Sequence, residues 1–316
     1  MTRFLIRRTL QALVVLLLVT VIVFALLHAL PGGPARAILG PRASLPQIEQ
    51  FNHDQGFDQP LPVQYLSYLW HLLGGDLGQS YRLNQPVLDL LAQRIPKTLV
   101  LTCSATLLAV AVAVPLGVLQ AVRRGRFTDH LLTGLSFLAY ATPAFFLGLV
   151  LIILFAQTWP LLPAEAPQSA GLGGVFAGFG GLLLPICTLA AGMIAAFSRY
   201  LRSSVLDNLT EDYVRTARSK GQSERRVLVR HVLRNALIPV VTLLGMYLPA
   251  LFGGTVVVES LFNYPGTGLL FWSAAQSSDF PVLLGVTLVV AAATVLGSLL
   301  ADLVYALLDP RIRTVR

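Results

Sequence analysis

Six long apolar runs constrain this chain more than any other feature of its sequence. Each holds about 20 or more residues with almost no charged side chain, which is the length an α-helix needs to cross a membrane. The runs cover residues 9–30, 98–122, 131–159, 179–197, 236–258 and 282–308. Only 12% of all residues are charged, about half the usual share in soluble proteins. The sequence therefore predicts an all-α integral membrane protein with six transmembrane helices.

Four of the runs contain an internal proline: Pro115, Pro143, Pro185 and Pro249. A proline in a helix interior removes one backbone hydrogen bond and kinks the helix. Membrane bundles tolerate such kinks when neighbouring groups or cavity water satisfy the freed carbonyl. We therefore expect kinks at these four positions.

Lysine and arginine are distributed unevenly between the two sides of this predicted bundle. Eighteen of the 23 lie before the first run, after the second, after the fourth and after the sixth. The loops after the third and fifth runs contain none. Because cytoplasmic loops are enriched in these residues, we predict that both termini and the loop after the fourth run face the cytoplasm.

The long first loop suggests a division of the chain into two parts. Residues 1–97 form the predicted N-terminal transmembrane helix and a long extracytoplasmic loop, in which we expect short helices at the outer surface. Residues 98–316 form a predicted five-helix core. A cytoplasmic loop at about 199–235 interrupts this core.

The predicted external loop after the fifth run is rich in aromatic residues, glycine and proline. It reads "ESLFNYPGTGLLFWS", and its Phe262, Tyr264 and Pro265 are candidates for an outer gate. Its rings are equally compatible with an aromatic belt at the membrane surface. The sequence alone leaves both interpretations open.

The most basic part of the chain is "YVRTARSKGQSERRVLVRHVLRNALIPV" at 213–240. Residues 208–212 contain capping and acidic side chains, which predict a helix start. Gly221 predicts the left-handed end of that helix. Ser223 predicts the cap of a second helix that starts at Glu224 and runs without a break into the fifth span.

Three interpretations of this basic segment compete. Its arginines can contact anionic lipid headgroups as a membrane anchor. A DNA-binding helix-turn-helix is disfavoured, because its recognition helix must be free to enter the major groove and here would be tethered to a membrane span. The third interpretation is a docking helix for a cytoplasmic partner, in which small residues such as Thr216 and Ala217 fit into a groove.

The sequence lacks the chemistry of an enzyme or of a self-powered transporter. It contains no G-x-x-x-x-G-K-[ST] phosphate-binding loop, and its five histidines have no metal-ligand spacing. Secondary transporters need ionisable side chains inside their spans. Five of the six runs contain no Asp, Glu, Lys or Arg. The sixth has only Asp302, near its cytoplasmic end, which could snorkel or pair with a nearby arginine. We therefore expect the energy for any transport to come from another chain.

The segment "DYVRTARSKGQSERRVLVRHVLRNALIP" resembles the cytoplasmic-loop signature of the dipeptide- and oligopeptide-transporting permease subunits of bacterial ABC importers. Similar matches are "LPGGPA" after the first run, "GDLGQSY" in the first loop, "PLGVLQAVRRGRFTD" after the second run and "DLVYALLDPRIR" near the end. The resemblance covers nearly the whole chain. Two positions depart from the wider pattern, since Arg215 replaces a usual glutamate and Gly33 a common aspartate.

The resemblance implies a type I ABC importer permease fold, with both termini cytoplasmic, and a coupling helix that inserts into a cleft of an ATPase subunit. The implied ATPase-coupling residues are Arg215, Thr216, Ala217, Arg218 and Gly221. This chain would hold no cofactor of its own, because ATP and Mg²⁺ would bind to the partner ATPase subunits.

The resemblance also implies the other members of the complex. These are a second homologous permease subunit, two nucleotide-binding domains, separate or fused, and an extracytoplasmic substrate-binding protein, in contact with membrane lipid and without nucleic acid. The chain would be a multi-pass protein of the bacterial cytoplasmic membrane that imports di- or oligopeptides by alternating access. Nickel complexes or haem are alternative substrates. A secondary transporter or channel, and a membrane-tethered regulator, are the alternatives from other classes.

Overall fold

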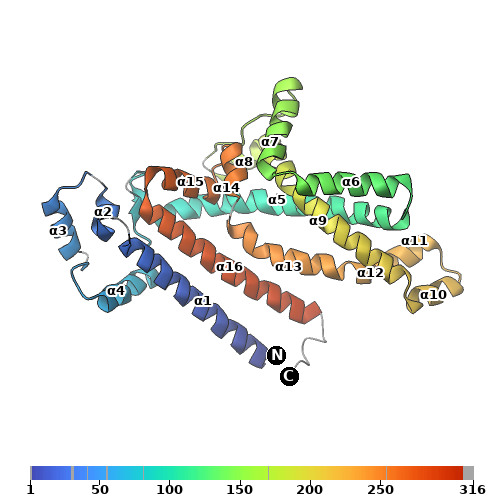
Figure 1. Cartoon of the computed structure of the whole chain (residues 1–316), viewed down its shortest axis with the longest axis horizontal. Coiled ribbons are helices and arrows are strands. Elements are labelled where there is room, and N and C mark those ends of the chain that lie inside the picture. Colours follow the sequence, from blue (N-terminus) through green and yellow to red (C-terminus); the bar gives the residue numbers. More distant parts are fainter. Residues whose placement is uncertain are drawn as a thin grey trace.

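The computed structural model describes residues 2–29, 32–40, 42–54, 56–80, 82–169, 171–253 and 255–308. The side chains of residues 300–308, including that of Asp302, and the whole C-terminal tail from 309 lie outside this description. Helices dominate the described part, as predicted (Figure 1). In chain order the helices are α1 (Thr2–His28), α2 (Gly33–Leu39), α3 (Leu45–Asp54), α4 (Leu61–Leu73), α5 (Val87–Val122), α6 (Phe127–Ala141), α7 (Ala144–Ile152), η1 (Ile153–Thr158), α8 (Leu172–Ala177), η2 (Phe179–Leu182), α9 (Leu183–Leu209), α10 (Asp212–Ser219), α11 (Glu224–Val227), η3 (Leu228–Val232), α12 (Leu233–Ala236), α13 (Ile238–Gly253), α14 (Val256–Leu261), α15 (Thr267–Ser277) and α16 (Phe280–Leu308).

Four helical stretches of the described chain are long and apolar enough to cross a membrane by themselves. They are Ile6–Ala29, Val87–Val122, Phe179–Leu209 and Phe280–Leu299. Two bent pairs, α6 with α7 and η1, and α11–α12 with the start of α13, pass the same test when each pair is taken together. Counting each pair as one span gives six, and each of the six overlaps one of the predicted runs.

The third predicted span is not one straight helix. Phe127–Ala141 and Ala144–Thr158 meet at 105°, and the break lies at Thr142 and Pro143. A proline forces the residue before it out of the helical region, and Thr142 has an extended conformation. The kink expected at Pro143 is therefore confirmed as a sharp break.

Pro115 and Pro185 do not interrupt their helices. Pro115 lies inside the continuous helix α5, and Pro185 lies in the first turn of α9, where a missing N–H leaves no intrahelical bond unmade. The side chain of Pro249 lies outside the described part.

The prediction of an unbroken second basic helix running into the fifth span is wrong. The π-helical stretch Leu228–Val232 widens the helix after α11. A turn at Leu237 then separates α12 from α13, and the two axes differ by 40°. The continuous apolar pattern on both sides hides this bend from sequence-based reasoning.

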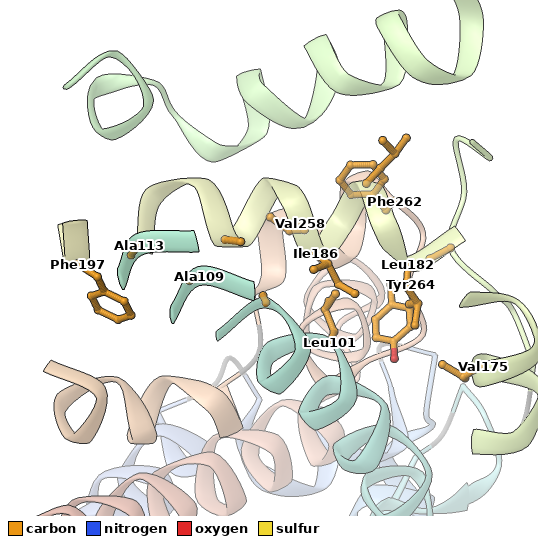
Figure 2. Close-up of a cluster of buried hydrophobic side chains, with 14 of the residues drawn as sticks. Leu101, Ala109, Ala113, Val175, Leu182, Ile186, Phe197, Val258, Phe262 and Tyr264 are labelled. Carbon is orange, nitrogen blue, oxygen red and sulfur yellow. The ribbon is translucent and has the colours of Figure 1, made fainter. Parts of the chain in front are cut away.

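The core of the bundle is the close contact between α5 and α9. Small residues recur every four positions on the buried face of α5: Ala105, Ala109, Ala113, Gly117 and Ala121. Their shortness lets the two backbones approach closely, as small residues do at helix contacts in membranes. Figure 2 shows how larger side chains, including Leu101 and Ile186, fill the space beyond this stripe.

The remaining elements surround this pair and divide into two ends (Figure 1). α1 packs against α16 and runs in the opposite direction. The start of α1 and the end of α16 lie toward the side of the molecule with α10 and α11, and α2, α3 and α4 lie at the opposite end. The short helices expected in the first loop are thus present, followed by a hairpin of β1 (Gln79–Ser80) and β2 (Gln85–Pro86). The predicted domain boundary at 97/98 falls inside α5, where the secondary structure is continuous.

We predict that Gly117→Ala destabilises the bundle. A Cβ atom at this position would lie 2.7 Å from the carbonyl oxygen of Ser198 and 3.0 Å from Cβ of Leu201, so α5 and α9 would have to separate. Overpacking of this kind costs about 1–3 kcal/mol, which thermal unfolding of the purified full chain in detergent measures as a lower transition temperature. Gly134→Ala is the matched control, because nothing lies within 4 Å of its added Cβ. Equal unfolding temperatures of the two variants would contradict the role of close α5–α9 contact.

Candidate coupling segment and a buried carboxylate cluster

The segment with the predicted coupling residues folds as two short helices joined by a tight turn. α10 ends at Ser219, and Gly221 follows with a φ of +72°, the left-handed conformation that glycine adopts at little cost. The backbone N–H of Gly221 donates to the carbonyl of Arg218, and that of Gln222 to the carbonyl of Ala217. Ser223 precedes α11 as predicted, although its side chain makes no capping hydrogen bond. We call residues 212–224 the coupling segment.

An ion pair across the turn connects the two helices of the coupling segment. The Nε atom of Arg218 donates to Oε1 of Glu224 at 2.8 Å, and its Nη2 atom to Oε2 at 3.1 Å. The hydrogen bonds to Glu224 raise the pKa of Arg218 above its ordinary value, so the guanidinium remains charged. Nε2 of His231 lies 3.0 Å from Oε1 of Gln222, which connects the turn to η3. The two parallel hydrogen bonds between Arg218 and Glu224 give the exposed turn a defined shape.

A buried cluster of small aliphatic residues seats the coupling segment on the rest of the chain. Val214 and Ala217 of α10 belong to this cluster, together with residues from the ends of α5 and α9, and α10 itself contacts α11 and η3. The buried members of this cluster are Ala121, Leu201, Val205, Val214, Ala217, Val227, Val232, Ala236 and Val240. One apolar cluster therefore connects the coupling segment with α5, α9 and the start of the fifth span.

The predicted coupling residues divide between the two faces of α10. Arg215, Thr216, Arg218 and Gly221 are exposed, whereas Ala217 is buried in the chain's own core. The small side chain of Ala217 thus allows α10 to approach this chain rather than projecting toward a partner. The surface left for a partner is polar and basic. That these residues contact an ATPase remains a prediction.

The predicted gate residues Phe262, Tyr264 and Pro265 are all buried. Figure 2 shows Phe262 and Tyr264 in the same apolar cluster as Leu101 and Leu182. Burial raises the pKa of Tyr264, and its neutral hydroxyl donates to the carbonyl of Lys97 at 2.7 Å. In the isolated chain these side chains fill the core and do not line an opening. Their role in an outer gate remains a prediction.

A buried carboxylate lies beside this loop. Glu259 is fully buried, and its Oε2 accepts hydrogen bonds from the backbone N–H groups of Gly268 at 2.7 Å and Leu269 at 3.0 Å. Oε1 accepts from the hydroxyl of Thr98 at 3.0 Å. The Thr98 oxygen in turn accepts from the N–H of Thr267 at 2.9 Å. We call these residues the carboxylate cluster, and they join α14, the start of α15 and α5.

The sequence "PGTG" at 265–268 shapes the binding site for this carboxylate. A Cβ atom on Gly266 would collide with the carboxylate of Glu259, and one on Gly268 would lie 2.8 Å from the backbone of Val256. Burial raises the pKa of Glu259, while the hydrogen bonds from Leu269, Thr98 and Gly268 oppose that rise. The N–H groups at the start of α15 also favour a negative charge. The two carboxylate oxygens act only as acceptors in these three hydrogen bonds. An ionised carboxylate, which has no proton to donate, requires this arrangement.

A second ion pair lies toward the other end of the α5–α9 pair. Asp129 at the start of α6 is buried and receives two hydrogen bonds from Arg202 of α9, at 2.9 and 2.8 Å. The N–H of Gly125 donates to the same carboxylate at 3.0 Å. The pair attaches α6 and the turn before it to α9.

Reasoning from the sequence missed both Glu259 and the Asp129–Arg202 pair. Glu259 is the single acidic residue between Glu224 and Asp279, and two glycines follow it within ten residues, so its isolation in an apolar region is a usable signal. Asp129 stands in the first turn of its helix, where an acid usually needs no partner. Its pairing with Arg202 depends on tertiary contact and leaves no sequence pattern.

The described residues contain no group of three or more histidine, cysteine, aspartate or glutamate side chains that could hold a metal ion.

Comparison with known proteins supplies independent information. A family model described as the binding-protein-dependent transport system inner membrane component matches residues 113–314, and a model of the N-terminal part of such components matches residues 1–102. The chain is 40% identical over 314 residues to the oligopeptide transport system permease protein AppB of Bacillus subtilis. It is 39% identical over 322 residues to a putative peptide permease protein of Brucella ovis, and 39% identical over 313 residues to the glutathione transport system permease protein GsiC of Salmonella paratyphi A. Each of these similarities covers 99% of both chains.

We predict that Glu259→Ala destabilises the contact between α5 and α15. The substitution leaves the N–H groups of Gly268 and Leu269 and the hydroxyl of Thr98 buried without their acceptor, and each unsatisfied buried group costs about 1–3 kcal/mol. A lower transition temperature for the full chain in detergent, with faster proteolysis in residues 255–280, is the expected result. Glu49→Ala removes an exposed carboxylate and should leave both measurements unchanged. Wild-type stability of Glu259→Ala would show that the cluster contributes little to the fold.

Proposed function

Because this chain belongs to the family of binding-protein-dependent transport system inner membrane components, and is a permease subunit of an ABC importer for peptides, we propose that it forms half of a translocation path for di- or oligopeptides. The other half would be a second, homologous permease subunit. Two nucleotide-binding domains would bind ATP and Mg²⁺ on the cytoplasmic side. An extracytoplasmic binding protein would deliver the peptide.

We also propose that the coupling segment faces the cytoplasm and contacts an ATPase subunit. Its exposed residues are basic and polar, and it projects at one end of the molecule (Figure 1). The turn after α5, which contains Arg123, Arg124 and Arg126, lies toward the same end. This gathering of positive charge supports a cytoplasmic position for that end of the molecule and for both termini. Membership of the family supports location in the bacterial inner membrane.

In this proposal, the cluster of small aliphatic residues under α10 transmits movement. Closure of the nucleotide-binding domains would displace α10, and its buried face would move the ends of α5, α9 and the fifth span together. Helices that move as packed bodies change the access of a central path from one side to the other. The observation that supports this most directly is that Val214 and Ala217 belong to one buried apolar cluster with residues of α5, α9 and α13.

The names of similar proteins favour peptides over the alternative substrates. The relatives described above are named as oligopeptide, peptide and glutathione permeases, and none of these three names mentions nickel or haem. No observation on this chain favours a secondary transporter or a tethered regulator. Peptides are therefore the substrate class that we propose.

The complex itself is the first experimental test. The tagged chain is purified gently from membranes, and the proteins that accompany it are identified. We expect a homologous permease, nucleotide-binding domains and a binding protein, and ATP hydrolysis that rises when the binding protein and peptide are added. Purification of the chain without any ATPase subunit would refute the proposal.

We predict that Thr216→Arg weakens binding of the ATPase subunit. Thr216 is exposed on α10, unlike the buried Ala217, so a bulky charged side chain there alters the partner surface without entering the core. A loss on the order of tenfold in affinity corresponds to about 1.4 kcal/mol. Retention of ATPase subunits on the immobilised complex and peptide uptake into proteoliposomes are the readouts.

Gln50→Arg is the control for this prediction, because it adds the same side chain to an exposed site on α3, at the opposite end of the chain. Both variants should insert into membranes and unfold at the same temperature. Normal ATPase retention and uptake in Thr216→Arg would exclude this face of α10 from the interface.

A further inference from the structure

Helix α4 has an unusual distribution of side chains. It contains no Asp, Glu, Lys or Arg. Val63, Leu66, Trp70 and Leu73 occupy one exposed face, and the last three have relative exposures of 65%, 77% and 83%. The opposite face is the more polar one, with Gln64 buried and Tyr65 and Tyr68 partly buried. A helix on a water-soluble surface shows the reverse pattern.

The polar face of α4 is attached to α1 by specific contacts. The hydroxyl oxygens of Thr20 and Tyr65 lie 2.9 Å apart, and Nε2 of His28 lies 2.7 Å from Oε1 of Gln64. The rings of Phe24 and Tyr65 meet edge to face with centroids 5.3 Å apart. The amide nitrogen of Gln64 also donates to the carbonyl of Phe57. These contacts determine which face of α4 points away from the bundle.

The contact with Thr20 also determines how deep α4 lies. The membrane-crossing stretch of α1 ends at Ala29, nine residues beyond Thr20. At 1.5 Å per residue, Thr20 therefore lies about 13 Å inside the end of that stretch. Because Tyr65 reaches it, α4 lies alongside the span of α1 and not above it.

Helix α1, to which α4 is attached, also exposes apolar side chains. Leu18, Ile22 and Leu26 of α1 are each more than half exposed, as expected for side chains that face lipid. Helix α3, in contrast, exposes Glu49 and Asp54 and buries Ile48, the usual pattern of a helix in water. The exposed face of α3 is therefore suited to water, and the exposed face of α4 to an apolar environment.

We propose that α4 is embedded in the bilayer and that its face formed by Val63, Leu66, Trp70 and Leu73 contacts lipid acyl chains. The helix has 13 residues and is about 20 Å long, too short to cross the membrane, so it lies within one leaflet beside α1. Tryptophan prefers the region where acyl chains meet headgroups. The first loop is thereby anchored to the membrane between its two flanking spans as well.

Lipid quenching of tryptophan fluorescence tests this proposal. The full chain has three tryptophans, and the variant Trp159→Phe with Trp272→Phe leaves Trp70 as the reporter. In nanodiscs with lipids brominated on their acyl chains, we expect loss of most of the Trp70 emission and protection from aqueous iodide. The control reporter is Gln50→Trp on α3, in a chain with all three native tryptophans changed to phenylalanine. It should respond to iodide and not to brominated lipid.

A second measurement covers the assembled transporter and the case in which the tryptophan variants fail to fold. A photoreactive benzoylphenylalanine replaces Leu73, whose side chain is the most exposed of the four. Irradiation of the complex should attach lipid to this position. Iodide quenching of Trp70 without lipid quenching would overturn the proposal. So would crosslinks from position 73 to another permease subunit or to the binding protein in place of lipid.

Discussion

Close contact between α5 and α9 is the constraint on which the rest of the structure depends. Membrane helices gain little from the hydrophobic effect against one another, because lipid is equally apolar, so their association relies on packing at short range. Ala109, Ala113 and Gly117 provide the smooth surface that this packing requires. The same stripe continues through Ala121 into the cluster beneath α10. The seat of the coupling segment is therefore an extension of the main helix contact.

Polar contacts attach peripheral elements to this pair near each of its ends. Thr98 of α5 binds Glu259 and so holds the start of α15, and Arg202 of α9 binds Asp129 and so holds α6. In surroundings of low dielectric such hydrogen bonds are strong, and breaking one leaves a costly unpaired group. Packing thus joins the central helices, and directional polar bonds fix the positions of the elements around them.

The sequence predicts those features that follow from composition and local conformation. The six apolar runs, the left-handed turn at Gly221 after α10 and the start of α11 at Glu224 are of this kind. The length of an apolar run and a left-handed turn depend on neighbouring residues alone. The 105° break is only half predictable, since Pro143 indicates a kink but not its angle. The inward orientation of Ala217 and the partners of Glu259 depend on contacts between distant segments. The isolation of Glu259 in the sequence marks the residue but not the groups that bind it.

The 40° bend at Leu237 has a mechanical consequence. Had α11, α12 and α13 formed one straight rod, a push on the coupling segment would slide the fifth span along its own axis, past neighbours that hold it by interdigitated side chains. With the bend, part of the same force would act perpendicular to the axis of α13 and would tilt that helix. In the proposed mechanism, a small displacement of the coupling segment would thus become a tilt of α13, the movement that widens one mouth of a helical channel while narrowing the other.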